Sequence, residues 1–133
     1  MYDPNRLAAE LDLLRGEFPD LETRDADGRT WVRLPRYPVP PGWSASTVEL
    51  VFAFPAEVGQ PPYAFLVRPA LSLSNGTQPG NYTPVGPATP WGDGFAQFSW
   101  SPLDAWIPRT DLRAGQNMLT FARSFATRLV ETS

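Results

Sequence analysis

Three residue types are missing from this 133-residue chain: it has no cysteine, no histidine and no lysine, so its eleven basic residues are all arginine. Without cysteine there is no disulfide framework and no thiolate nucleophile. Without histidine the usual general base near neutral pH and the commonest metal ligand are absent. Without lysine there is no Schiff base and no side-chain amine that could accept an acyl group. These absences favour a binding or scaffolding protein over an enzyme.

The chain also has little net charge and no long apolar run. A net charge of −3 gives no basic face for nucleic acid, so we expect no nucleic-acid partner. No apolar stretch approaches the roughly 20 residues that span a bilayer, so we expect no membrane partner. The first residues lack the basic and then apolar layout of a secretory signal, which predicts a cytoplasmic protein. The length suits a single domain over residues 1–133.

Proline, in contrast, is abundant. It occupies 16 of the 133 positions, more than twice its usual share of ~5 %. The prolines fall mainly in three stretches, 35–41, 55–69 and 79–90. Because proline lacks a backbone donor and does not fit a helix interior or a central strand, these stretches predict connections, with the regular elements between them.

Helical signals occur at both ends of the chain. Asp3 suits an N-cap, Pro4 suits the first helical position and Gly16 suits a stop, which predicts a first helix over 4–15. A second helix is predicted over 112–131, where five apolar residues repeat with helical spacing. These residues are Met118, Phe121, Ala122, Phe125 and Leu129.

Extended, apolar segments lie between the two predicted helices. Four of them predict an antiparallel meander, namely 21–24, 29–34, 47–54 and 63–67. The first two flank an Asp-Gly pair, a strong hairpin signal. Residues 72–94 lack any period and predict a long irregular segment, and a last short strand is expected over 95–100. Strands grouped between helices, without alternation, indicate an α+β fold in which helices cover one sheet.

The order of these elements and the positions of the prolines resemble the ubiquitin-conjugating enzyme (UBC) fold, and most closely the bacterial UBC-like proteins of prokaryotic family E. Four groups of residues carry the resemblance, over about half of the chain. They are Tyr37-Pro38-Val39-Pro40-Pro41-Gly42-Trp43, then 48–55, then Pro61-Pro62-Tyr63 with 65–69, and finally Phe98-Ser99-Trp100-Ser101 with Trp106-Ile107-Pro108. The resemblance implies a UBC-like α+β domain with a four-stranded meander.

The chain departs from the enzymatic members of this superfamily at the position that carries their chemistry. Those members have a His-Pro-Asn turn followed by a thioester-forming cysteine. Here Arg68-Pro69-Ala70 stands near that turn, and residues 72–94 contain no cysteine. Neither the hydroxyl of Tyr82 nor its serine and threonine neighbours have a histidine or lysine to activate them. The resemblance therefore implies a UBC-like domain without catalytic residues and without a cofactor.

By the same resemblance the partners would be a ubiquitin-like protein, its activating enzyme, or both, in a bacterial conjugation or defence pathway. Arg6, Glu10 and Arg15 on the first helix would meet the activating enzyme. The sheet or the segment 72–94 would meet the ubiquitin-like protein, with Tyr82 and Trp91 as candidate contacts. Glycines flank Trp91, which makes it the best candidate for an exposed aromatic anchor.

Other interpretations stay open. Asp93 and Asp104 are flanked by aromatic residues, so a tryptophan-lined cleft with two carboxylates would indicate a small hydrolase or a carbohydrate-binding protein. The chain could instead be a subunit of a larger assembly, with its proline-rich loops as the interface. The sequence does not distinguish a monomer from a homodimer. The acidic hairpin around Asp25 and Asp27 is better explained by turn chemistry than by metal binding, so no metal ligand is predicted.

Overall fold

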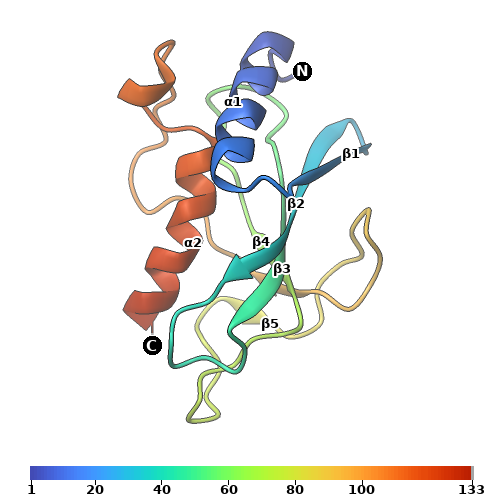
Figure 1. The fold of residues 1–133 in the computed structure, drawn as a ribbon, viewed down its shortest axis with the longest axis vertical. Coiled ribbons are helices and arrows are strands. Elements are labelled where there is room, and N and C mark those ends of the chain that lie inside the picture. The colour runs from blue at the N-terminus through green and yellow to red at the C-terminus, as the bar shows by residue number, and fades with distance from the viewer. Residues whose placement is uncertain (133) are drawn as a thin grey trace.

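Two helices lie on one side of a single antiparallel sheet in the computed structural model, which describes residues 1–132 (Figure 1). The α+β class is therefore confirmed. In chain order the elements are α1 (Pro4–Glu17), β1 (Glu22–Ala26), β2 (Arg29–Pro38), β3 (Thr47–Ala53), β4 (Phe65–Arg68), β5 (Tyr82–Thr83), β6 (Ala96–Phe98), the 3₁₀ helix η1 (Leu112–Ala114) and α2 (Met118–Thr132).

The sheet has six strands in the order β1-β2-β3-β4-β6-β5, and every neighbouring pair is antiparallel. Its first four strands form the predicted meander. The expectation of a four-stranded sheet is wrong: β6, which lies within the short strand expected over 95–100, adds to the edge of β4, and β5 adds to β6. β5 consists of Tyr82 and Thr83 alone, which is too short to give an alternating pattern. It lies inside the segment 72–94 that was expected to be irregular throughout.

The β1–β2 hairpin turns at the predicted position. Asp27 and Gly28 have φ angles of 55° and 74°, the left-handed values that a type I′ two-residue hairpin turn needs at both positions. β2 runs on to Pro38, four residues beyond the predicted end at 34. Its register with β3 shifts between Leu34 and Tyr37. This irregularity lets Pro35 lie within the strand, since proline cannot donate to a regular ladder.

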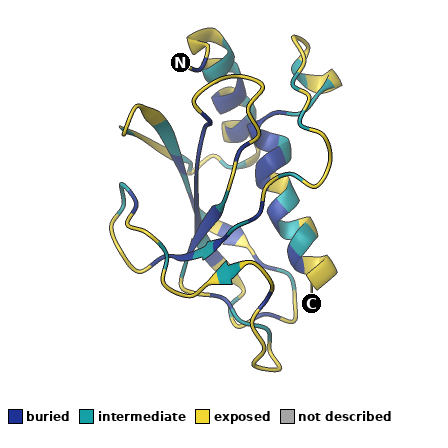
Figure 2. Cartoon of the chain, turned by 180° about the vertical axis from the view of Figure 1, so that it is seen from behind, coloured by how far each residue is buried: buried dark blue, intermediate teal, exposed yellow. Residues whose placement is uncertain are grey.

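The sheet has an inner face that meets the helices and an outer face that does not. The alternation along β3 places Leu50 and Phe52 on the inner face, as the sequence predicts. Phe65 on β4 stacks on Phe121 of α2 with ring centroids 4.2 Å apart. The five apolar residues predicted for the second helix are all buried against this face (Figure 2). The main core therefore lies between the sheet and the two helices.

α1 begins as expected but ends later. The Asp3 side chain accepts a hydrogen bond from the backbone N–H of Asn5, as an N-cap does. Gly16 lies inside the helix rather than terminating it, so the predicted end at residue 15 is wrong. The helix stops at Phe18, whose N–H donates to Leu14. Phe18 precedes a proline, and a residue in that position is disfavoured from the helical conformation.

The second helix starts later than predicted. Residues 112–114 form η1, and α2 itself begins at Met118. The reason is a cap: the side-chain oxygen of Asn117 accepts hydrogen bonds from the backbone N–H groups of Leu119 and Thr120, at 2.9 and 3.1 Å. The turn from η1 to Asn117 places Gln116 beside the start of α2.

Candidate functional site

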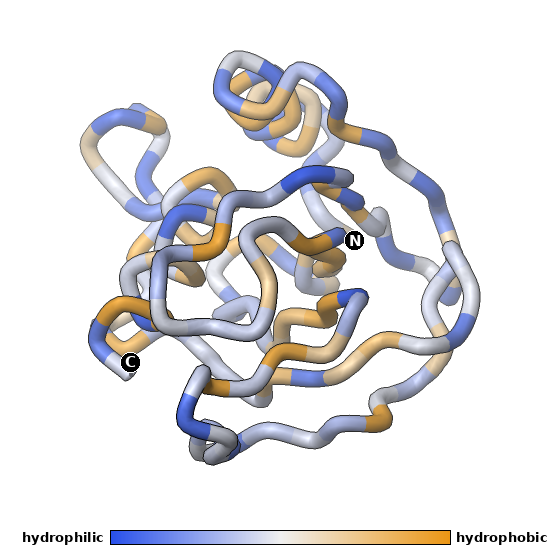
Figure 3. Tube along the Cα trace, turned by 60° about the horizontal axis from the view of Figure 1, so that its bottom comes forward, coloured by the Kyte–Doolittle hydropathy of each residue, from blue (hydrophilic) through white to orange (hydrophobic). Residues whose placement is uncertain are grey.

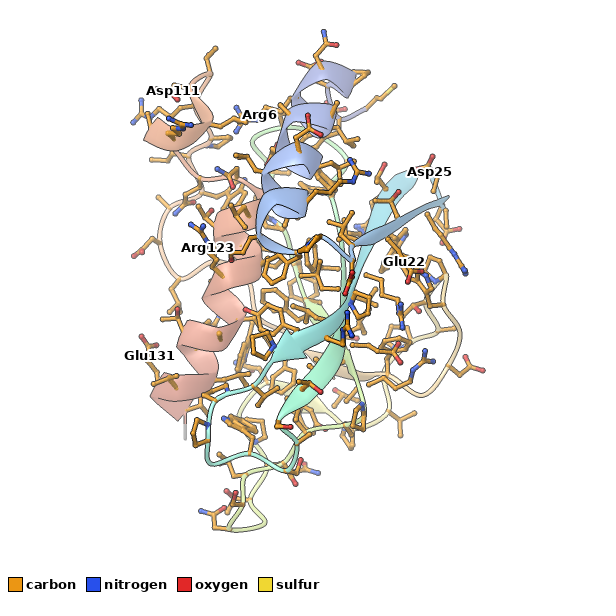
Figure 4. The ribbon with its side chains drawn as sticks, viewed as in Figure 1. Arg6, Glu22, Asp25, Asp111, Arg123 and Glu131 are labelled. Carbon is orange, nitrogen blue, oxygen red and sulfur yellow. The ribbon has the colours of Figure 1, made fainter. Side chains whose placement is uncertain are left out.

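A groove runs along α2, between the helix and the segment 101–107 that precedes it. Its cavity volume is about 380 Å³, which is within the range of binding sites for small ligands or for two or three side chains. The lining residues are Pro102, Leu103, Asp104, Trp106, Gln116, Thr120, Phe121, Arg123, Ser124, Thr127, Arg128 and Glu131. Figure 4 shows Arg123 and Glu131 on the side of α2 that faces away from the sheet.

The apolar part of the groove is built by packing that the sequence only partly reveals. Trp106 lies edge-on to Phe121 of α2, with ring centroids 6.3 Å apart, and this contact holds the segment 101–107 beside the helix. Leu103 is 70 % exposed at the mouth of the groove, and Ile107 nearby in sequence is 49 % exposed. Leu103 thus adds exposed apolar surface at the mouth of the groove.

Both arginines of the groove are already engaged within the chain. The Arg123 guanidinium donates three hydrogen bonds to the Glu17 carboxylate of α1, at 2.6 to 3.2 Å, and these bonds raise its pKa. The Arg128 guanidinium lies 4.6 Å from the ring centre of Trp100 and donates to the carbonyl of Ser101 at 2.7 Å. Partial burial lowers the pKa of Arg128, and the nearby Glu131 opposes that shift.

The groove contains an exposed carboxylate and a buried amide oxygen that form no hydrogen bond within residues 1–132. The Asp104 carboxylate makes no hydrogen bond or ion pair within residues 1–132. The side-chain oxygen of Gln116 is buried, and among the described residues it is the one buried side-chain nitrogen or oxygen without a hydrogen bond. Leaving such an atom unsatisfied costs about 1–3 kcal/mol. Because this oxygen is buried, a ligand in the groove reaches it only if the Gln116 side chain moves.

The two carboxylates considered for a hydrolase lie on different sides of the sheet. Asp104 lines the groove beside α2, which packs on the inner face. Asp93 belongs to a segment on the outer face, where its carbonyl accepts a hydrogen bond from Arg68 at 3.0 Å. Glycosidase chemistry needs two carboxyl groups roughly 5–9.5 Å apart across one cleft. The structure brings Trp106, but not Asp93, to the cavity of Asp104.

The outer face of the sheet carries a row of alternating charges that crosses four strands. Glu22 on β1 pairs with Arg33 on β2 at 2.5 Å, Arg33 pairs with Glu49 on β3 at 3.1 Å, and Glu49 pairs with Arg68 on β4 at 2.7 Å. We call these four residues the ion ladder. Partial burial alone would raise the pKa of Glu49, but the hydrogen bonds and charges of Arg68 and Arg33 outweigh it and hold the pKa below its ordinary value.

The ion ladder also fastens the chain segment 84–95 over this face. Arg68 donates to the carbonyls of Trp91 and Asp93, and the Trp91 indole N–H donates to Glu22 at 3.3 Å. The Trp91 ring packs beside a small apolar cluster formed by Val51, Leu66 and Phe95. Trp91, expected as an exposed anchor, is therefore half-buried, because its ring and its N–H are both used within the chain.

Tyr82 and the residues chosen on the first helix have mixed environments. Tyr82, on the edge strand β5, is half-buried with its ring 4.8 Å from that of Phe98, and burial raises its pKa. Arg15 is exposed and pairs only with Asp12, at 3.7 Å. Arg15 and the exposed part of the Tyr82 side chain are open to a partner in this structure.

Arg6 and Glu10 face the interior instead of solvent. Both were expected to meet the activating enzyme, yet Glu10 is completely buried. Its carboxylate accepts hydrogen bonds from the Tyr2 hydroxyl, the Arg6 side chain and the Met118 backbone N–H. Arg6 in turn reaches the carbonyls of residues 109 and 116 (Figure 4). The two side chains fix α1 against the start of α2, so Glu10 is not available for a partner.

A second hollow, wider and shallower, lies between the β1–β2 hairpin and residues 55–63. Its volume is about 590 Å³, and it is lined by Arg29, the exposed Tyr63 and the prolines 55, 61 and 62. The Arg29 guanidinium lies 5.8 Å from the ring centre of Trp31. Among the described residues that line this hollow, none has a buried side-chain atom without a hydrogen bond. The groove beside α2 is therefore the stronger candidate for a binding site.

The described residues show neither a metal site nor a membrane-spanning helix, and the chain matches no known protein in three comparisons. Within residues 1–132 no group of three acidic residues is placed to hold a metal ion. Hydropathy alternates over short lengths of the trace (Figure 3), and no helix in the described part is long and apolar enough to cross a membrane. Comparison of the chain with protein-family models, with curated proteins and with solved structures gives no match.

Sequence reasoning found part of the groove and missed the rest. Asp104 and Trp106 were singled out, but Leu103 and Gln116 were not. A signal for Leu103 existed: Leu103, Trp106 and Ile107 are apolar residues in a proline-flanked stretch outside every predicted element. No sequence signal marks Gln116, because its lack of a partner depends on how the turn after η1 folds back against α2.

Proposed function

We propose that this chain is a non-catalytic UBC-like protein-binding domain of a bacterial ubiquitin-like conjugation or defence pathway. It recognises a ubiquitin-like protein, its activating enzyme, or both. The resemblance in the sequence supports the pathway, and the missing cysteine, histidine and lysine support binding without catalysis.

One structural observation carries the location of the binding surface. The outer face of the sheet is covered by the chain's own segment 84–95, held there by the ion ladder. The groove beside α2 is open, has an apolar floor and keeps Leu103 70 % exposed at its mouth. An apolar centre with a polar rim is the usual anatomy of a protein-binding patch. The partner therefore binds at α2.

Isothermal titration with a bacterial ubiquitin-like protein and with its activating enzyme tests the proposal. Leu103→Asp, which places a charge at the mouth of the groove, should weaken binding at least tenfold. Val85→Asp is the matched control, because Val85 is 83 % exposed on the segment over the outer face and its replacement should leave binding unchanged. Absence of binding to both proteins would overturn the proposal, and equal effects of the two variants would overturn the location.

Carbohydrate binding is a second candidate, and one observation favours it. Trp106 and Asp104 line the same cavity, and an aromatic ring beside a carboxylate suits the faces and hydroxyls of a sugar. Titration of the isotope-labelled protein with short oligosaccharides tests this, with the indole N–H signal of Trp106 as the readout. A saturable shift of this signal that Asp104→Asn weakens would support sugar binding, whereas no shift at millimolar sugar would reject it.

A further inference from the structure

We propose that the free edge of β1 is a self-association surface, where a second copy of this chain adds its own β1 antiparallel and joins the two sheets. The inference goes beyond the proposed function and does not depend on it. Three features of β1 lead to it: the backbone groups at its open edge, the exposure of that edge, and a charge pattern that is complementary to itself.

The hydrogen-bonding pattern of the β1–β2 hairpin turns every second residue of β1 outward. The residues that flank its two-residue turn form a hydrogen-bonded pair, so the next pair, Asp25 and Thr30, does not. In agreement, the Thr30 carbonyl accepts from the N–H of Phe54, on the far side of β2. The backbone groups of Asp25, and by the same alternation those of Thr23, therefore point to the open edge. No other part of residues 1–132 bonds to them.

This edge lacks three of the usual protections against strand pairing, namely proline, a bulge and a covering segment. β1 contains no proline, its pairing with β2 runs over all five residues without a shift, and four of the five are exposed. It ends the sheet, and Figure 1 shows no helix or strand of the described chain beyond it. The opposite edge strand, β5, has only two residues. β1 is therefore the edge that is long enough to pair.

The charges of β1 select both the occupant and its register. When Thr23 lies opposite Thr23 of the second copy, Glu22 of each copy lies opposite Arg24 of the other, which gives two pairs of opposite charge. Outward-facing residues must oppose each other, and the two neighbouring registers that allow this place Glu22 opposite Glu22 or Arg24 opposite Arg24. Like charges in directly opposed positions destabilise a strand pair. The Glu-Thr-Arg sequence thus matches a second copy of itself in the register centred on Thr23.

Both charged side chains have capacity for a further partner. The Arg24 guanidinium donates to the carbonyl of Pro90 at 2.5 Å and lies 5.1 Å from the ring centre of Trp91, and it has no carboxylate partner within residues 1–132. A guanidinium carries five donors, so it can still bind a carboxylate. The Glu22 side chain is 47 % exposed at the end of the ion ladder. In the dimer the ladder continues from Glu22 to Arg24 of the second copy.

Sedimentation equilibrium and nuclear magnetic resonance of the whole chain test the inference. Two five-residue strands bury less than the roughly 1,200 Å² of a standard interface, so we expect a weak dimer with a Kd of roughly 10 µM to 1 mM. The amide signals of Thr23 and Asp25 should shift with protein concentration, because their N–H groups become hydrogen-bonded. A chain that stays monomeric up to about 1 mM, or whose concentration-dependent shifts all lie outside β1, would overturn the inference.

Two charge variants test the register. Arg24→Glu places a second carboxylate opposite Glu22, and Glu22→Arg places a second guanidinium opposite Arg24, so each variant alone should self-associate at least tenfold more weakly than the parent. Mixed together, the two variants restore two pairs of opposite charge and should form a heterodimer. Arg113→Glu makes the same change of charge at an exposed residue of η1 and should leave self-association unchanged. A mixture that stays monomeric, or an equal effect of Arg24→Glu and Arg113→Glu, would show that the register is wrong.

A proline variant tests the backbone pairing without changing any charge. The N–H of Thr23 points outward, so Thr23→Pro removes no hydrogen bond within the chain, but it removes both hydrogen bonds at the centre of the dimer. This variant should be monomeric, with thermal unfolding as the check that it folds. Thr23→Ser keeps the N–H and should retain the dimer. A folded Thr23→Pro that associates as tightly as the parent would show that the copies meet elsewhere.

Discussion

The carboxylate of Glu10 accepts a hydrogen bond from the backbone N–H of Met118, the first residue of α2, at 2.6 Å. Glu10 lies in the middle of α1, so this hydrogen bond joins the two helices through residues that are 108 positions apart in the chain. A carboxylate at a helix N-terminus is stabilised by the helix dipole and satisfies an N–H that has no partner within the helix. The contact therefore fixes the start of α2, close to Gln116, which lines the groove.

Replacing Glu10 with alanine should destabilise the protein strongly. The change leaves the Tyr2 hydroxyl, the Arg6 guanidinium and the Met118 N–H without their shared acceptor. Removing one partner of a buried charged network costs about 3–5 kcal/mol, and urea unfolding measures that loss. Glu10→Gln, which keeps an acceptor oxygen, should lose clearly less. Asp12→Ala, with its side chain 83 % exposed, should stay within about 0.5 kcal/mol; a loss below 1 kcal/mol for Glu10→Ala would contradict the role.

Tyr37 should make the stability of the protein fall at high pH. Its hydroxyl donates to the carbonyl of Ala122 at 2.6 Å and accepts from the N–H of Ala126 at 3.1 Å. Burial raises the pKa of Tyr37 from 10.0 to about 12. Because the folded state holds this proton more tightly than the unfolded state does, the contribution is complete below pH 10 and is lost as the pH rises from 10 through about 12.

Urea unfolding between pH 8 and 12 checks this dependence. Tyr37→Phe should lower the free energy of unfolding at pH 8 by about 1–2 kcal/mol, because the two hydrogen bonds are lost. The variant should also lose less stability than the parent between pH 10 and 12. The remaining decline belongs in part to Tyr2, whose pKa burial also raises. Parallel curves for the parent and Tyr37→Phe would show that the Tyr37 hydroxyl does not titrate in this way.

Glu49 should contribute stability that is lost in acid. The arginines of the ion ladder hold its pKa below the ordinary value of 4.5, so its contribution is complete above pH 4.5 and declines as the pH falls through the lower folded value. Glu49→Gln should cost about 1.5–3 kcal/mol at pH 7, the usual range for hydrogen bonds to a charged group, and should reduce the acid-induced loss. Unfolding at pH 7 and at pH 3 measures both effects, and equal acid sensitivity of the two proteins would refute the role of the ladder.

Two glycines should respond to alanine with opposite signs. A Cβ on Gly115 would lie 2.3 to 2.8 Å from atoms of Arg109, one of them a backbone atom, so the turn would have to move at a cost of about 1–3 kcal/mol. Gly16 has open space around a Cβ and lies inside α1, where alanine should stabilise by about 0.5–1 kcal/mol. Thermal unfolding compares the two variants. A stabilised Gly115→Ala would show that the turn beside the groove is loosely packed.

Local patterns in the sequence were enough for most of the regular structure. The alternation along β3 and the helical spacing of Phe121 and Phe125 predict which residues form the core, because burial on one face imposes a period of 2 or 3.6. Asp3 and the Asp27-Gly28 pair predict a helix start and a hairpin for equally local reasons. The errors occur where a distant contact decides: β5 exists only because β6 offers an edge, and α2 starts at its cap on Asn117 rather than at Leu112.

The absence of cysteine, histidine and lysine was settled by the sequence alone, and it restricts the chemistry of these residues however they fold. Which polar residues are free to act was decided by tertiary structure. Arg6 and Glu10 are held between two helices and Trp91 is held over the outer face, so three of the residues chosen from sequence are used internally. Asp104 and Gln116 line the same groove because α2 and the segment 101–107 pack side by side. Side-chain availability depends on contacts between residues far apart in the chain, and no local pattern records those contacts.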